Sequence, residues 1–159
     1  PRGLGDVYKR QVLALSRQGL KAFRSEKSSD NKVSKGGYIL NDISSKRDLT
    51  LIATGSEVEI AMEASVLLKA EGIKAAVVSL PCWELFDKQD DTYRKDVLGN
   101  APRIGIEAAC DMGWSKYIGD NGIFIGMKSF GASGPADHLY KYFGITSEAI
   151  VTHAKTLIK

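Results

Sequence analysis

The feature that most constrains the fold is a regular alternation of short apolar runs with helical segments, which begins at Gly36 and continues to Lys159. Short apolar runs between turn signals are typical of buried strands, whereas the longer stretches between them have the apolar spacing of helices. Strands separated by helices require crossover connections and form a largely parallel sheet with both faces covered. The sequence therefore predicts an α/β fold with three layers.

The expected elements can be assigned to residue ranges. In the segment "SEVEIAMEASVLLKAEG", Ser56 and Glu59 have the spacing of a capping box and Gly72 is a stop signal. Pro135 is favoured at the first position of a later helix. Strands are predicted over 37–40, 48–55, 73–81, 103–109 and 122–127. Helices are predicted over 56–72, 112–119, 135–144 and 147–159, with a broken helical stretch over 82–99.

The residues before Gly36 have a different character. Residues 12–15, "VLAL", form an apolar strand candidate, and Arg17 follows closely on it. Residues 19–37 are polar, charged and rich in serine, which is a linker composition. We therefore expect residues 12–35 to be the tail of a preceding domain and a linker, and residues 36–159 to form one domain.

The first eleven residues, "PRGLGDVYKRQ", have the glycines and cations of an anion-binding loop. They lack the preceding strand and the following helix that would confirm such a loop. "RGLGDVYKRQ" is also what one reading frame of a common transposase-based sequencing adapter encodes. We interpret residues 1–11 as an adapter-derived scar, outside the fold, and expect the chain to be a fragment.

Composition limits the classes of partner. The chain has 22 Lys and Arg against 19 Asp and Glu, and without the first eleven residues these become 19 and 18. A net charge of about +1 gives no reason to expect a nucleic acid or an anionic membrane as partner. No apolar run approaches the roughly 20 residues of a membrane span, so we expect a cytoplasmic protein. Cys82 and Cys110 lack metal-ligand spacing and are expected to be reduced thiols.

Two turns could bind a ligand, although each also has a structural explanation. The turn "ATGSEVE" follows a strand, where open parallel sheets bind ligands, but its acidic residues would repel a phosphate and its Ser and Glu suit capping. The loop "SFGASGPADHL" could line an interface or a site. Its Gly131, Ser133, Gly134 and Pro135 are equally explained by a tight strand-to-helix connection.

Other reactive side chains form no recognisable catalytic set. His138 and His153 have no partner at helical spacing, which favours surface or core positions over metal ligation. We expect the acidic residues to form a solvated rim; they are Glu84, Asp87, Asp90 and Asp91. No nucleophile and base can be paired.

Arg17 is the candidate that the residues single out. It follows an apolar strand, where clefts of α/β domains open, and its planar guanidinium suits bidentate binding of phosphate or carboxylate. A simple ion pair with a nearby acid explains the arginine equally well.

Several stretches together resemble the C-terminal part of transketolase. They are "LALSRQ", "GGYIL", "LIATGSEVEIAMEA", "GIKAAVVSLPCWELFDKQDDTYRKDVL", "KYIG" and "GMKSFGASGPADHLYKYFGIT". The resemblance implies an enzyme with thiamine diphosphate and Mg²⁺ that moves a two-carbon ketol unit between sugar phosphates in the pentose phosphate pathway. It implies a homodimer whose cofactors lie between other domains, so that none is bound by this chain.

The same resemblance implies a five-stranded mixed sheet with one antiparallel strand. It also implies that Arg17, in "SRQ", contacts the substrate phosphate. On this basis we expect the C-terminal portion of a transketolase, inactive by itself, that serves dimer and interdomain packing. The alternatives are a stand-alone α/β interaction or regulatory module, and the equivalent domain of another thiamine-diphosphate enzyme.

Overall fold

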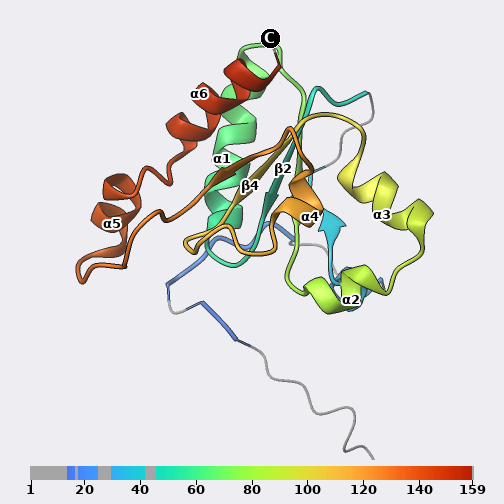
Figure 1. Cartoon of the computed structure of the whole chain (residues 1–159), viewed down its shortest axis with the longest axis horizontal. Helices are drawn as coiled ribbons and strands as arrows, with labels where there is room; N and C mark the ends of the chain where they lie inside the picture. The colour runs from blue at the N-terminus through green and yellow to red at the C-terminus, as the bar shows by residue number, and fades with distance from the viewer. Residues whose placement is uncertain (1–13, 17, 25–29, 42–45, 159) are drawn as a thin grey trace, which may run out of the picture.

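A five-stranded mixed sheet organises the chain, and only one of its strand pairs is antiparallel (Figure 1). The computed structural model describes residues 14–16, 18–24, 30–41 and 46–158. The strand order is β1-β3-β2-β4-β5, and the antiparallel pair is β1 with β3. The strands are β1 (Tyr38–Ile39), β2 (Leu49–Ala53), β3 (Ala75–Ser79), β4 (Arg103–Ile106) and β5 (Ile123–Ile125). The predicted α/β fold with a mixed sheet is confirmed.

The two central strands are buried along their whole length. Every residue of β2 and β3 is buried, and the strands pair in parallel with Leu51 opposite Val77. Runs rich in β-branched and aliphatic residues, rather than a strict apolar and polar alternation, are what a sheet covered on both faces requires. The burial pattern therefore explains why these segments read as continuous apolar runs in the sequence.

Helices cover both faces of the sheet, which gives three layers. In Figure 1, α1 and α6 lie to one side of β2 and β4, and α3 and α4 lie to the other. Two apolar clusters fill the spaces between the layers, one centred on Leu51, Leu68 and Ile150, the other on Phe86 and Trp114. The helices are α1 (Glu57–Ala70), α2 (Trp83–Asp87), α3 (Asp91–Leu98), α4 (Ser115–Ile118), α5 (Ala136–Tyr142) and α6 (Ser147–Leu157).

The helix ends agree with the sequence in part. Helix α1 ends at Ala70, and Gly72 has a positive φ of 81°, as a stop signal should. The predicted capping box of Ser56 and Glu59 is wrong, because Ser56 makes no side-chain cap and instead donates to the Glu57 carboxylate at 2.8 Å. Pro135 was predicted at the first position of a helix, but α5 begins one residue later, at Ala136, and Pro135 is its N-cap residue.

The segment before the sheet is not a strand where the structure describes it. Ala14, Leu15 and Ser16 have no regular secondary structure, and Leu15 is 84% exposed. A strand needs a partner for its backbone groups, and none of the described strands pairs with these residues. The predicted linker contains a short 3-10 helix, η2 (Lys32–Lys35), which ends at Gly36 with a φ of 78°.

Helix α4 packs directly on the backbone of β4 at Gly105. A Cβ at this position would lie 2.7 Å from the Cε3 atom of Trp114, whose side chain is fully buried. We expect Gly105→Ala to lower the free energy of unfolding by about 1–3 kcal/mol, because neither the strand nor the indole can move away freely. Urea unfolding measures the change.

Gly19→Ala is the matched control, since a Cβ at Gly19 meets nothing within 4 Å. Its effect should stay within about 0.5 kcal/mol. Equal stability of the two variants would contradict the close packing of α4 on β4.

Candidate functional site

The carboxyl ends of the parallel strands form one edge of the sheet, and that edge is where α/β folds bind ligands. The chain leaves β2 toward β3 on one side and later adds β4 on the other side of β2. This reversal of strand order opens a crevice beside the ends of β2 and β4. Gln18 lines a cavity at this edge together with Ala108, in the loop that follows β4, and residues 20–24 line a second cavity together with Gly55, in the turn that follows β2.

A buried polar network ties α5 to the start of α1 at this edge. The Tyr140 hydroxyl donates to Oε1 of Glu57 at 2.5 Å, and the Ser56 hydroxyl donates to the same oxygen at 2.8 Å. Glu57 is only 5% exposed, so these donors replace the water that its carboxylate loses on folding. Burial, together with the hydrogen bond to Glu57, raises the pKa of Tyr140 to about 12.

Two cavities lie between the linker and the sheet edge. One of about 210 Å³ is lined by Gln18, Ala108, Leu139 and Tyr140 among others. The other, of about 360 Å³, is lined by residues 20–24 together with Gly55, Glu59 and Ser79. The linker therefore lies over the carboxyl ends of β2 and β3.

Arg17, the predicted phosphate-binding residue, lies outside the described residues. Its two neighbours are described. A Cβ at Gly55 would lie 3.4 Å from the Ser16 hydroxyl oxygen, and Gln18 lines the cavity that Tyr140 also lines. Both neighbours of Arg17 are therefore at the carboxyl edge of the sheet.

The loop "SFGASGPADHL" reaches the same edge. Gly131 and Ala132 line the smaller cavity, while residues 131–135 are all exposed. His138 and His153 are exposed on α5 and α6, as predicted. Within the described part of the chain, no group of three or more His, Cys, Asp or Glu side chains could hold a metal ion.

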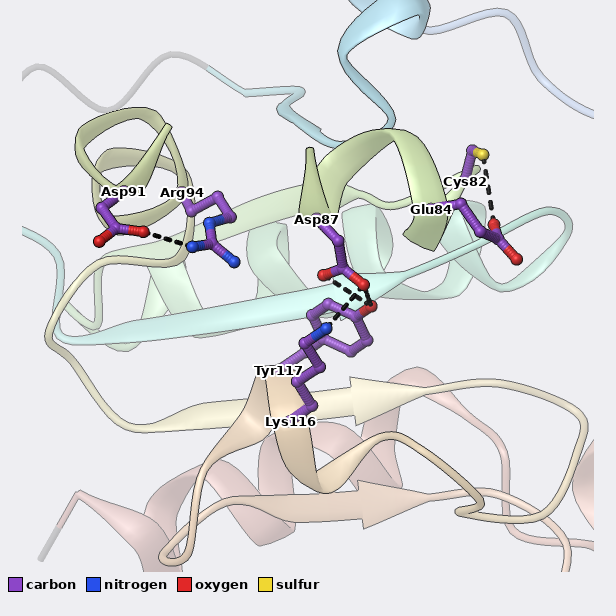
Figure 2. Close-up of polar contacts among 7 residues, drawn as sticks. All are labelled: Cys82, Glu84, Asp87, Asp91, Arg94, Lys116 and Tyr117. Atoms are coloured by element: carbon purple, nitrogen blue, oxygen red, sulfur yellow. Dashed lines mark hydrogen bonds and ion pairs between the residues drawn. The ribbon is translucent and has the colours of Figure 1, made fainter. Parts of the chain in front are cut away.

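The acidic residues near α2 and α3 are not all a solvated rim. Asp87 accepts hydrogen bonds from Lys116 at 2.7 Å and from the Tyr117 hydroxyl at 3.2 Å, so the prediction is wrong for this residue (Figure 2). The Asp87 side chain is 30% exposed. Burial of the Tyr117 hydroxyl is the main cause that raises the pKa of Tyr117, and the negative charge of Asp87 is the next.

The other three acids are exposed, as predicted. Asp90 caps α3 by accepting from the Tyr93 amide at 2.8 Å, Asp91 pairs with Arg94, and Glu84 accepts from the Cys82 thiol at 3.5 Å. Cys82 and Cys110 are free thiols.

Sequence reasoning missed the network of Ser56, Glu57 and Tyr140. Glu57 and Tyr140 are 83 residues apart, and no local spacing connects them. The available signal was Glu57 itself, because it lies four residues before Ala61 and so on the helix face that carries Ala61 and Leu68.

Removing the Tyr140 hydroxyl tests this network. We expect Tyr140→Phe to lower the free energy of unfolding by about 1–3 kcal/mol, because the buried Glu57 carboxylate loses a donor. Tyr142→Phe is the control, since Tyr142 is 78% exposed, and its effect should stay within about 0.5 kcal/mol.

The network also sets an alkaline dependence of stability. The folded chain holds the Tyr140 proton more tightly than the unfolded chain, whose tyrosine has the ordinary pKa of 10.0. Stability should therefore be unaffected below that pH and fall as the pH rises toward about 12. A loss of equal size in Tyr140→Phe would show that Tyr140 does not contribute to it.

No helix in the described ranges is long and apolar enough to cross a membrane.

Comparison with known proteins gives the chain's relatives. The model of the transketolase-like TK C-terminal domain matches residues 36–146. Transketolase of Sinorhizobium medicae is 51% identical in an alignment that covers 98% of this chain and 23% of that protein. At this coverage the alignment includes part of residues 1–11. The chloroplastic transketolase of Solanum tuberosum is 50% identical over 91% of this chain and 20% of its own length.

Solved structures agree with these relatives. A crystal structure of transketolase from Pichia stipitis in complex with sedoheptulose-7-phosphate has a TM-score of 0.74 and 41% identity, and the match covers 80% of this chain and 18% of that one. The chain thus spans about a fifth of the length of the proteins it matches. Because the family model covers most of the chain and the fold agrees, the chain belongs to the transketolase C-terminal domain family.

Proposed function

We propose that the chain is the C-terminal portion of a transketolase, which transfers a two-carbon ketol unit between sugar phosphates. The observation that carries the proposal is the family match over residues 36–146 in a chain with about a fifth of the length of its relatives. The chain by itself is inactive in this proposal, and it serves packing between domains and subunits of a homodimer.

The cofactors of the complete enzyme are thiamine diphosphate and Mg²⁺ in this proposal. When bound, thiamine diphosphate supplies the carbanion chemistry of ketol transfer. Among the described residues, no group of three or more His, Cys, Asp or Glu side chains could hold the metal ion. Our proposal places the binding of both cofactors in parts of the enzyme outside this chain, and it assigns no reaction step to the described residues.

Arg17 is the residue of this chain that we assign to the substrate, through the phosphate. Its guanidinium presents a planar set of donors that matches phosphate oxygens. Support comes from its neighbours Ser16 and Gln18, which lie at the carboxyl edge of the sheet. The sedoheptulose-7-phosphate of the Pichia stipitis complex is a sugar phosphate, which is the substrate class that this role requires.

Exposed apolar side chains support the packing role. Phe130 is 99% exposed and Met112 is 79% exposed, and Phe130 borders a groove of about 850 Å³ that Phe124 and Met127 also line. An exposed phenylalanine at the border of a groove with partly apolar lining is a feature of surfaces that contact other protein. We propose a cytoplasmic location, without a nucleic acid or membrane partner, although one relative is a chloroplastic enzyme.

The role of Arg17 can be tested in the complete enzyme. We expect Arg17→Ala to raise KM for phosphorylated acceptors and to lower kcat/KM by roughly 10- to 150-fold, because a charged hydrogen bond to phosphate is lost. Steady-state kinetics with phosphorylated and non-phosphorylated acceptors measure the effect.

Lys69→Ala is the control, because Lys69 is an exposed cation near the C-terminal end of α1, away from the carboxyl edge of the sheet. Its kinetics should equal those of the unmodified enzyme. Equal losses for phosphorylated and non-phosphorylated acceptors in Arg17→Ala would refute the assignment to phosphate.

The proposed inactivity of the chain alone is tested by assaying ketol transfer with thiamine diphosphate, Mg²⁺ and a ketose phosphate donor. The 159-residue chain should give the rate of the blank, while the complete enzyme turns over. Turnover by the chain alone would contradict the proposal, since cofactor binding would then lie within it.

A further inference from the structure

A basic cavity lies on the face of the sheet covered by α2, α3 and α4, near the amino end of β4. Its volume is about 290 Å³. Its charged lining consists of Arg94, Lys95, Arg103, Lys116, Asp87 and Asp91. The cavity is at the opposite end of β4 from the loop that lines the candidate functional site, so it is a separate feature.

The cations of this cavity outnumber its carboxylates. Lys116 pairs with Asp87 at 2.7 Å, and Arg94 pairs with Asp91 (Figure 2). These side chains belong to α2, α3 and α4, and all of them line the cavity. Among the described residues, Lys95 and Arg103 have no ion pair with a carboxylate. The cavity therefore keeps two positive charges that the described side chains do not balance.

Arg103 is held in place without being neutralised. Its terminal nitrogens donate to the backbone carbonyls of Tyr117 and Gly99. Burial, and next the positive charge of Arg47, lower the pKa of Arg103. Two guanidinium groups close enough to repel each other form an arrangement that an anion beside Arg103 would stabilise.

Two of the arginines that line this cavity each carry a hydrogen-bond donor without a partner. In the described ranges, two buried side-chain nitrogens have no partner, and they are Nε of Arg94 and Nε of Arg103. Buried donors without a partner are uncommon, and one of the reasons for them is an ion that normally occupies the site. Both donors belong to arginines that line this one cavity.

We propose that this cavity binds a small anion of the phosphate class, either inorganic phosphate or a phosphate monoester. Two unbalanced cations match the charge of about −2 that such a group carries near neutral pH, whereas a single carboxylate would balance only one. The volume is at the lower limit of ordinary ligand sites, which restricts the occupant to a small molecule.

The ion pair of Arg94 does not prevent such binding. The Asp91 side chain is 75% exposed, and exposed ion pairs contribute little to stability. Arg94 can therefore exchange Asp91 for a phosphate oxygen, while water takes over the carboxylate. Lys116 stays with Asp87 and Tyr117, so Arg94, Lys95 and Arg103 are the groups that we assign to the anion.

Calorimetric titration of the 159-residue chain with inorganic phosphate, at pH 7.5 and constant ionic strength, tests this inference. We expect one saturable site. Arg94→Gln should weaken it about tenfold, because a charge-assisted hydrogen bond is lost. Lys95→Gln, at an exposed position that the fold does not need, should also weaken it by several-fold.

Lys69→Gln removes the same charge from an exposed position on α1, across the sheet, and should leave the affinity unchanged. Acetate should not compete at the same ionic strength, since it carries one charge. The inference is overturned if phosphate does not saturate, if Lys69→Gln weakens binding as much as Lys95→Gln, or if acetate competes equally. The anion site is separate from the proposed function. A kinetic result that refutes the role of Arg17 would therefore leave this inference untouched.

Discussion

The structure depends on strand β2, which is buried on both faces and pairs with β3 on one side and β4 on the other. Leu49, Leu51 and Ala53 enter one apolar cluster, while Ile52 enters the other. A single strand thus joins the two halves of the core, because side chains alternate between the faces of a sheet. The position of β2 also fixes the turn at residues 54–56, and with it the carboxyl edge where the candidate functional site lies.

The sequence was sufficient for the order of strands and helices after Gly36, because short apolar runs, helical spacing and glycine stops are local signals. It failed where a side chain's partner is distant along the chain. Ser56 looks like a cap, but its hydroxyl group donates to Glu57 and accepts from Tyr140 instead. Asp87 looks like a surface acid, but Lys116 and Tyr117 approach it from a helix that follows β4. No local pattern contains such pairings.

The proposed substrate role of Arg17 came from resemblance, and the structure adds only the position of its neighbours. The division of the chain at residue 36 and the adapter origin of residues 1–11 stay predictions. The fold explains why chemistry is sparse among the described residues. Several polar side chains connect elements: Thr50 donates to the carbonyl of Leu98, and Asn41 forms hydrogen bonds with the backbone of β3.

The two outer strands are short, with two residues in β1 and three in β5. A long edge strand promotes aggregation because its unpaired N–H and C=O groups can form hydrogen bonds with a strand of another chain. Here both borders offer very few such groups. The described sheet is therefore a poor template for a strand from another polypeptide, which leaves the helices and loops as the surfaces better suited to association.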